Sequence, residues 1–290
     1  MLRVLLLLSI LTGLFLAAGY SVGIYFGDPA TALELSLVMA LMMNLITYLY
    51  SDKIVLAMTG ARIVGPNEYP KLHSIVERVA TLASLPKPRV AVIDSSAPNA
   101  FATGRGPNRS VVTVTKGLMT ILDEDEIEAV IGHEISHIKD RDILVSTIAA
   151  TIAGAISYLA YMGRWGIYFG SDSRRRGEGS SIAALLSVIL APIAAFIVQM
   201  AISRSREYLA DENGAKITKK PIELANALVK ISGAKKIGLI MNTNPSTSHM
   251  WIINPLRGGG LLELFSSHPP VEKRVERLKK LARELGIYYF

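Results

Sequence analysis

The chain has 290 residues, of which 50% are hydrophobic and only 19% are charged, a composition too apolar for an ordinary soluble domain of this size. It contains no cysteine, which excludes disulfides, a thiolate nucleophile and a cysteine-ligated metal. The net charge of +7 would suit nucleic acid, but no nucleic-acid-binding motif is present, and basic segments beside a membrane explain the charge better. The composition therefore predicts an integral membrane protein with the lipid bilayer, and not nucleic acid, as its partner.

Four segments are apolar and long enough to cross a bilayer, which requires about 20 residues. They comprise residues 4–26, 29–50, 143–163 and 179–203. The first is longer than the apolar stretch of about 7–15 residues in a secretory signal peptide, and the second follows it almost at once. We therefore expect a retained N-terminal hairpin and about four transmembrane helices in all.

Lys and Arg are distributed unevenly between these segments. Residues 27–29 carry neither, whereas residues 51–142 and everything after residue 203 are rich in both. The positive-inside rule places these two regions on the cytoplasmic side of the cell membrane. The loop between the third and fourth segments would then lie outside, although it contains Arg174, Arg175 and Arg176, so a shallow or protein-packed hairpin is the alternative there.

The pattern divides the chain into four parts. These are a transmembrane hairpin (1–50), a cytoplasmic catalytic half (51–142), a second transmembrane hairpin (143–203) and another cytoplasmic catalytic half (204–290).

Alternation and β-branched residues predict strands at residues 89–94 and 110–115, with a short edge strand between them at 100–103. Apolar spacing predicts a helix in residues 67–85, with Leu82 on its apolar face, and further helices at 123–140, 205–217, 221–232 and 269–286. Asp123 is the expected N-cap of the helix at 123–140, with Glu126 three residues later in a capping box. The expected fold class is α+β, mainly helical with one small sheet.

The helix at 123–140 carries the sequence HEISH. His133 and His137 are four residues apart, so both imidazoles project from one helix face, and two neutral imidazoles suit Zn²⁺. Glu134 is rotated by about a third of a turn and can reach a water that zinc activates, since zinc lowers the pKa of bound water to about 7. The carboxylate can take the proton as the water attacks a carbonyl. A pair of surface histidines is the alternative, but the apolar neighbours predict a buried helix.

The sequence identifies the third metal ligand less directly. The continuation H-x-x-G-x-x-H fails, because Asp140 stands where Gly is required and Ile143 where the third His is required. The remaining candidates are downstream carboxylates and the other histidines, His73, His249 and His268.

Among the carboxylates, Glu207 and Asp211 in the sequence SREYLAD are again four residues apart. This spacing lets Glu207 bind the metal while Asp211 accepts a hydrogen bond from a ligand His, which fixes its tautomer. An ordinary surface pair is the alternative. Because two membrane segments return the chain to the same side, HEISH and SREYLAD can meet at the membrane surface.

Five motifs occur in order along the chain: NAFATG, HEISHIKDRD, SREYLAD, NPSTSHMWIINPL and LFSSHPPVEKRVERL. With the two apolar pairs, they resemble the HtpX family of membrane-bound zinc metalloproteases over essentially the whole chain, within a wider group that includes the CAAX-prenyl-protease type. The resemblance implies a zincin-like domain and one zinc ion per chain. It also implies Glu207 as third ligand, Glu134 as catalytic acid/base, and proteolysis of misfolded or damaged membrane proteins at the cytoplasmic face, a quality-control role during stress.

The resemblance carries over further positions less firmly. A substrate-pairing edge strand is implied for Asn99, Ala100, Phe101 and Ala102, with a simple turn as the alternative.

His268, in the His-Pro-Pro segment, matches a residue that can donate a hydrogen bond to the developing oxyanion, with a structural role as the alternative. His249 lies among apolar residues and is expected to be structural, and Asp140 is at most a partner of a ligand His.

Three functions remain open on the sequence: a zinc endopeptidase acting on proteins or peptides, a zinc-dependent membrane scaffold or sensor, and a hydrolase of non-peptide substrates. The presence of Glu134 favours an enzyme over a scaffold, and the candidate edge strand favours a peptide substrate. The sequence does not indicate an oligomeric state.

Overall fold

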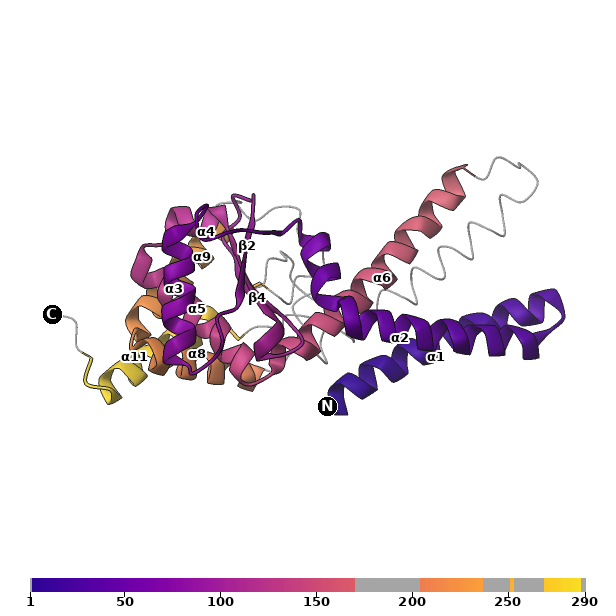
Figure 1. The fold of residues 1–290 in the computed structure, drawn as a ribbon, viewed down its shortest axis with the longest axis horizontal. Coiled ribbons are helices and arrows are strands. Elements are labelled where there is room, and N and C mark those ends of the chain that lie inside the picture. The colour runs from indigo at the N-terminus through magenta and orange to yellow at the C-terminus, as the bar shows by residue number, and fades with distance from the viewer. Residues whose placement is uncertain (1, 170–203, 237–250, 253–268, 288–290) are drawn as a thin grey trace.

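The structure is a computed structural model that describes residues 2–169, 204–236, 251–252 and 269–287. Helices α1 (Leu2–Phe26) and α2 (Pro29–Thr59) form an antiparallel hairpin that extends from one end of the molecule (Figure 1). Asp28 Oδ1 accepts a hydrogen bond from the Thr31 N–H at 3.2 Å, so it caps α2 at the position where helix N-termini favour Asp.

The two helices of this hairpin approach closely at two glycines. A Cβ atom added to Gly23 would lie 2.6 Å from the Pro29 Cα, and one added to Gly19 would collide with the Ser36 side chain. Within the described part of the chain, α1 over Leu2–Ser21 and α2 are long and apolar enough to cross a membrane. The first two expected spans therefore correspond to observed helices.

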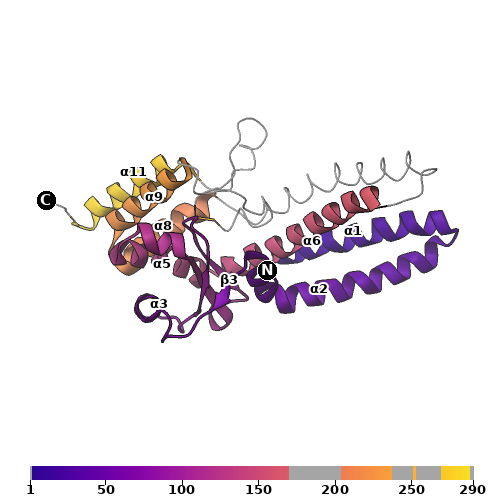
Figure 2. The same cartoon turned by 90° about the horizontal axis from the view of Figure 1, so that it is seen from above.

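Helix α6 (Asp142–Phe169) packs against the base of this hairpin with its first half and then diverges from it (Figure 1 and Figure 2). Its residues Ile148, Ile152 and Ile156 form a buried cluster with Val4, Leu7 and Leu11 of α1. The apolar part of α6 is shorter than those of α1 and α2 and spans Asp142–Ile156. The fourth expected span and the Arg174–Arg176 loop lie outside the described residues, so a total of four transmembrane helices stays a prediction.

The other end of the molecule, here called the head, contains a four-stranded sheet. Its strand order is β1 (Arg62–Ile63), β2 (Arg89–Ile93), β4 (Ser110–Thr115) and β3 (Ala100–Gly104). β2 and β4 are parallel, whereas β1 and β3 pair antiparallel with their neighbours. The strands expected at 89–94 and 110–115 are thus present, and β3 occupies a sheet edge as expected.

Helices pack against this sheet and against each other to form the rest of the head. They are α3 (Pro70–Leu82), α4 (Lys116–Ile121), α5 (Glu124–Lys139), α8 (Arg204–Thr218), α9 (Pro221–Lys236) and α11 (Val271–Glu284), with a short 3-10 turn η1 at Pro107–Arg109.

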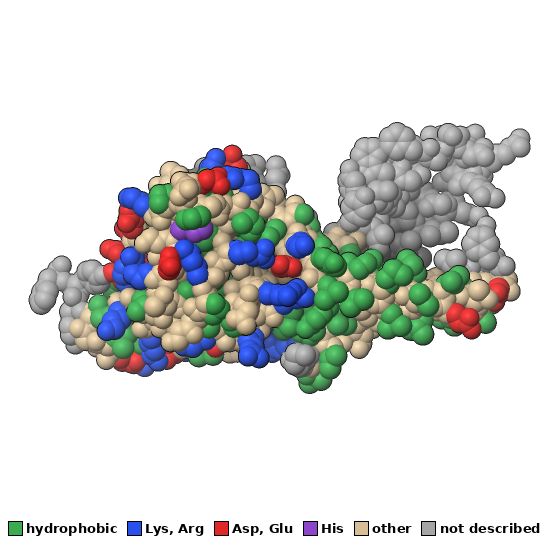
Figure 3. Space-filling view, viewed as in Figure 1, with side chains coloured by type: hydrophobic (Ala, Val, Ile, Leu, Met, Phe, Trp, Pro, Cys, Tyr) green, Lys and Arg blue, Asp and Glu red, His purple; other side chains and the backbone are tan. Residues whose placement is uncertain are grey.

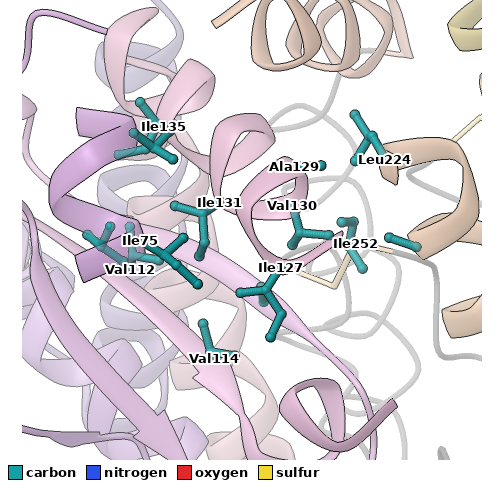
Figure 4. Close-up of a cluster of buried hydrophobic side chains, with 14 of the residues drawn as sticks. Ile75, Val112, Val114, Ile127, Ala129, Val130, Ile131, Ile135, Leu224 and Ile252 are labelled. Carbon is teal, nitrogen blue, oxygen red and sulfur yellow. The ribbon is translucent and has the colours of Figure 1, made fainter. Parts of the chain in front are cut away.

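Helix α5 is central in the head, and its apolar side chains lie within the main core. Ile127 and Ile131 pack in the same cluster as Val112 and Val114 of β4, and Leu224 of α9 belongs to it too (Figure 4). The capping box expected at the start of α5 is present: the Glu126 N–H donates to Asp123 Oδ1 at 2.8 Å, and the Asp123 N–H donates to Glu126 Oε2 at 3.1 Å.

Two expectations differ from the structure. α2 does not stop at residue 50 but continues to Thr59, and its last turns, including Ser51 and Val55, are buried against the head, so the first domain boundary falls inside a continuous helix. Leu82 is 55% exposed, because α3 ends there and its last residue projects beyond the core.

Candidate metal centre

Three potential metal ligands come together from two helices. His133 and His137 lie one turn apart on α5, and Glu207 lies in the first turn of α8. The Nε2 atom of His133 is 3.7 Å from Glu207 Oε2, and the Nε2 atom of His137 is 3.5 Å from Glu207 Oε1. One ligand atom from each residue lies within 4.8 Å of the others, and His133 and Glu207 are buried.

The spacing of these atoms fits zinc. Two ligands bound about 2.1 Å from a tetrahedral ion stand about 3.4 Å apart, close to the two N–O distances. Two imidazoles and one carboxylate form the ligand set of catalytic zinc sites that keep a fourth position open. The residues present therefore suit a zinc ion by both chemistry and geometry.

Glycines allow α5 and α8 to approach closely enough for this arrangement. A Cβ atom on Gly132 would lie 2.6 Å from Thr218 Cγ2, and one on Gly214 would lie 2.6 Å from the His133 backbone nitrogen. The two helices are thus in backbone contact beside the first histidine. Glycine in a helix interior costs about 1 kcal/mol relative to alanine, and here it permits the short interhelical distance.

Asp211 and Arg274 stand behind His133. Asp211 Oδ1 is 3.0 Å from His133 Nδ1, and Asp211 accepts two hydrogen bonds from Arg274, at 2.6 and 2.7 Å. Burial alone would raise the pKa of Asp211, but the charge and hydrogen bonds of Arg274 hold it well below its ordinary value. The ionised carboxylate favours a proton on His133 Nδ1, which leaves the Nε2 lone pair on the side of Glu207.

Arg274 also links this network to the sheet. Its side chain is fully buried, and it donates a hydrogen bond to the Ile252 carbonyl at 2.9 Å. The N–H of Ile252 in turn donates to Asn99 Oδ1 at 3.1 Å, immediately before β3. A continuous set of hydrogen bonds therefore runs from Asp211 to the residue that begins the candidate substrate strand.

Glu134 is 5% exposed and lies between the histidines and β3. Burial raises the pKa of its carboxyl group, while His133 and His137 lower it, as does the backbone N–H of Ala102. A nearby dication would favour the ionised form of this carboxyl group. The residue expected to act as the base thus lies on the same helix as the two histidines and contacts the sheet edge.

The free edge of β3 faces this site. The Ala102 N–H points away from β4 toward Glu134, and the Gly104 N–H donates to Thr147 Oγ1 at 3.2 Å. All five residues of β3 are nevertheless buried, and Ala102 is only 7% exposed. The strand is at the expected edge, but it is covered in this conformation.

Other residues considered from the sequence lie elsewhere. His73 is buried, with Nε2 3.2 Å from the Val64 carbonyl oxygen, and it is outside the ligand group. Asp140 is exposed at the C-cap of α5, and the acidic residue near His137 is instead Asp142, whose Oδ2 is 3.7 Å from Nδ1. His249 and His268 lie outside the described residues.

Sequence reasoning missed Arg274, Gly214 and Asp142. Arg274 precedes Leu278 by one helical turn, so it is a charged residue on the apolar face of α11, a pattern that signals a buried ion pair.

The model of peptidase family M48 matches residues 66–282. A protein named protease HtpX homolog from Pyrococcus furiosus is 53% identical over 284 residues, covering 98% of this chain and 96% of the relative. The homolog from Aquifex aeolicus is 49% identical over 279 residues, covering 94% and 90%.

Among solved structures, the crystal structure of S. mikatae Ste24p superposes with a TM-score of 0.48 at 22% sequence identity. The match covers 96% of this chain and 64% of that chain.

Proposed function

The chain belongs to peptidase family M48 and is an HtpX-type metalloprotease, and on that premise we propose that it is a membrane-bound zinc endopeptidase. His133, His137 and Glu207 hold one zinc ion per chain, and Glu134 is the general base and acid. The observation that carries this proposal is the convergence of these three ligand atoms within 4.8 Å beside a buried glutamate.

Zinc, when bound, polarises water and the substrate carbonyl group. The chain supplies the remaining functions. Glu134 accepts the proton of the attacking water and returns it to the leaving amine, a role that favours a pKa above the usual range for a carboxyl group. Asp211, held ionised by Arg274, fixes the orientation of the His133 ring.

We propose that the substrate pairs with the free edge of β3 through Ala100 and Ala102. Backbone pairing is tolerant of sequence, which suits an enzyme that acts on many unfolded segments. Because β3 is buried here, this proposal requires that the edge becomes accessible when a peptide binds. His268 is proposed to donate a hydrogen bond to the developing oxyanion.

The active site is proposed to lie at the cytoplasmic membrane face, and the substrates to be misfolded or damaged membrane proteins. The packing of Phe101 in β3 against Val55 of α2 and Ala150 of α6 supports the first point, because the site then directly adjoins the apolar helices. Residues 51–142 are rich in Lys and Arg, whereas residues 27–29 carry neither, and this difference supports the cytoplasmic orientation.

Proteolysis of an unfolded reporter protein by the purified, detergent-solubilised chain tests this function. We expect cleavage that a chelator abolishes and that added zinc restores, with the Glu134→Gln variant as the control for a contaminating protease. Chelator-resistant cleavage would contradict the proposal. Zinc binding without any cleavage would favour a scaffold or sensor, and hydrolysis of esters alone would favour a non-peptide substrate.

A further inference from the structure

A basic pocket lies where the apolar hairpin meets the head. Its volume is about 490 Å³, and its walls come from the end of the apolar part of α2, the loop before β2, and the turn between β3 and β4. In Figure 3, blue side chains gather at this junction, next to the green surface of the hairpin. The metal ligands do not line this pocket, so it is separate from the candidate metal centre.

The pocket carries excess positive charge. Of its twelve lining residues, five are Lys or Arg and one, Asp52, is acidic. Asp52 pairs with Arg89 at 3.1 Å, and Lys87 pairs with Glu77 at 2.7 Å.

The two arginines of the β3–β4 turn, Arg105 and Arg109, have no carboxylate within 4 Å among the residues that the structure describes. The Nε atom of Arg105 is buried, and it finds no hydrogen-bond partner in that part of the chain. Two guanidinium groups that line a cationic pocket without a carboxylate partner indicate a binding site for an anionic acceptor.

The turn that carries both arginines has a defined conformation. The Arg105 N–H donates to the Arg109 carbonyl at 3.1 Å, and the Arg109 N–H donates to the Gly106 carbonyl at 3.0 Å. Gly104 has a φ of 141°, and a Cβ atom there would collide with the Arg109 carbonyl oxygen. Glycine is thus required at the start of the turn, and the two guanidinium groups are presented from a fixed backbone.

If the hairpin crosses the membrane, the pocket lies at the level of the lipid headgroups. From Pro29 to Tyr50, α2 is about 33 Å long at 1.5 Å per residue, close to the roughly 30 Å hydrocarbon core of a bilayer. Leu45 and Tyr50 are 57% and 47% exposed, so the apolar outer surface of α2 runs up to the pocket. The Nζ atom of Lys53 lies 5.3 Å from the Tyr50 ring centroid, and tyrosine beside lysine at the end of an apolar helical segment is typical of the membrane interface.

We propose that this pocket binds the phosphate group of an anionic membrane lipid, with Arg105 and Arg109 as its main ligands. Guanidinium groups bind phosphate oxygens in a bidentate manner. A lipid also places its acyl chains on the exposed apolar surface of α2, a contact that a soluble anion lacks. The inference rests on the proposed membrane location and adds an anionic lipid as a partner of the enzyme.

Calorimetric titration of the full-length protein in a neutral detergent tests the inference. The probes are dihexanoyl phosphatidylglycerol below its micelle concentration, the uncharged analogue dihexanoyl phosphatidylcholine, and inorganic phosphate. We expect the phosphatidylglycerol to bind at least tenfold more tightly than either of the others. Phosphate bound as tightly as phosphatidylglycerol would identify a soluble-anion site and overturn the lipid proposal.

The Arg105→Gln/Arg109→Gln variant should lose about 30-fold in affinity for phosphatidylglycerol, since each basic residue at a membrane surface contributes about 1 kcal/mol. The matched control is Lys279→Gln/Lys280→Gln, which removes the same charge from α11, on the opposite side of the head (Figure 2). An equal loss in both variants, or none in the first, would contradict a defined site. If the double variant does not fold, Arg109→Gln alone replaces it, because Arg109 is exposed, and a smaller loss of phosphatidylglycerol affinity is expected.

A separate measurement distinguishes failure of this inference from failure of the proposed membrane location. The wild-type protein is reconstituted in phosphatidylcholine vesicles and washed with alkaline carbonate. Retention together with no preference for phosphatidylglycerol would overturn only the lipid site. Release from the vesicles would overturn the membrane location and the lipid site together, while leaving zinc-dependent cleavage of a soluble reporter unaffected.

Discussion

The helix pairs α1–α2 and α5–α8 share one packing device and use it in opposite surroundings. Both approach closely at glycines, Gly19 and Gly23 in the first pair and Gly132 and Gly214 in the second. The first pair exposes large apolar side chains, such as Leu35 at 63%, whereas the second buries imidazoles and carboxylates. Close packing therefore makes a hairpin suited to lipid in one place, and in the other it brings a carboxylate to two histidines.

The largest effect is expected at Glu134, the buried carboxylate beside the histidines of α5. Glu134→Gln keeps the shape but removes the proton acceptor, so cleavage should fall by about 10²–10⁴-fold while zinc content is kept. Rates with an unfolded reporter and metal analysis of the purified variant measure the two quantities. Glu124→Gln, at the exposed start of α5, is the control, and an undiminished rate for Glu134→Gln would remove this residue from the mechanism.

Removing Arg274 tests how far the buried charges of the head depend on each other. Arg274→Leu leaves Asp211 ionised in the interior without its partner, which should lower the free energy of unfolding by about 3–5 kcal/mol. Denaturant unfolding of the full chain in detergent provides the measurement, with Arg283→Leu on the exposed side of α11 as the matched control. Similar losses of unfolding free energy in the two variants would mean that the buried pair stabilises the fold no more than an exposed arginine does.

Alanine substitutions at the interhelical glycines test whether the two helix pairs affect zinc binding independently. Gly214→Ala should cost about 1–3 kcal/mol through overpacking and weaken zinc binding, because α8 and Glu207 must move away from His133. Gly233→Ala, at a helical glycine with open space around it, should be neutral or stabilising. Gly23→Ala should disturb the hairpin and leave zinc affinity unchanged. Zinc affinity that falls equally in Gly23→Ala and Gly214→Ala would show that the two pairs are coupled.

The smallest effect concerns pH. Burial raises the pKa of Glu128, but hydrogen bonds from Arg78 and Lys220, each with a 2.7 Å contact, lower it below the ordinary value of 4.5. A carboxyl group with a lowered pKa in the folded state stabilises the fold fully above pH 4.5 and loses that contribution as the pH falls through its folded-state pKa.

Glu128→Gln should therefore lower the free energy of unfolding at pH 7 by about 1 kcal/mol, since Arg78 is half exposed, and should reduce the loss of stability on acidification. Unfolding curves between pH 3 and 7 for wild type and variant check this. Parallel pH profiles would assign the acid sensitivity to other groups.

The sequence predicted those parts of the molecule that depend on local pattern. Alternation located β2 and β4, and Asp123 with Glu126 located the start of α5, because strand and cap signals act over a few residues. The spacing of His133 and His137 is likewise a property of one helix. By contrast, the pairing of Arg274 with Asp211 joins residues 63 positions apart, and no local pattern specifies which buried charge meets which.

The burial of β3 and the continuation of α2 to Thr59 also lay beyond sequence reasoning. Small residues such as Ala100 and Ala102 fit both a covered and an exposed edge, and only the packing of α5 and α6 decides between them. The apolar span ends at residue 50, but α2 continues through the polar residues Ser51 and Asp52, which are buried where the hairpin joins the head. Tertiary contacts thus overrode the composition signal at this boundary.

The central claim is that α5 and α8 together form one zinc site, and the zinc content of the Glu207→Ala variant tests it most directly. The full-length protein is purified and its zinc measured by elemental analysis, beside wild type and Glu212→Ala, a carboxylate on α8 that pairs with Lys216 at 2.5 Å and not with the histidines. We predict one zinc ion per chain in wild type and in Glu212→Ala, and almost none in Glu207→Ala. Full zinc occupancy in Glu207→Ala would contradict the account.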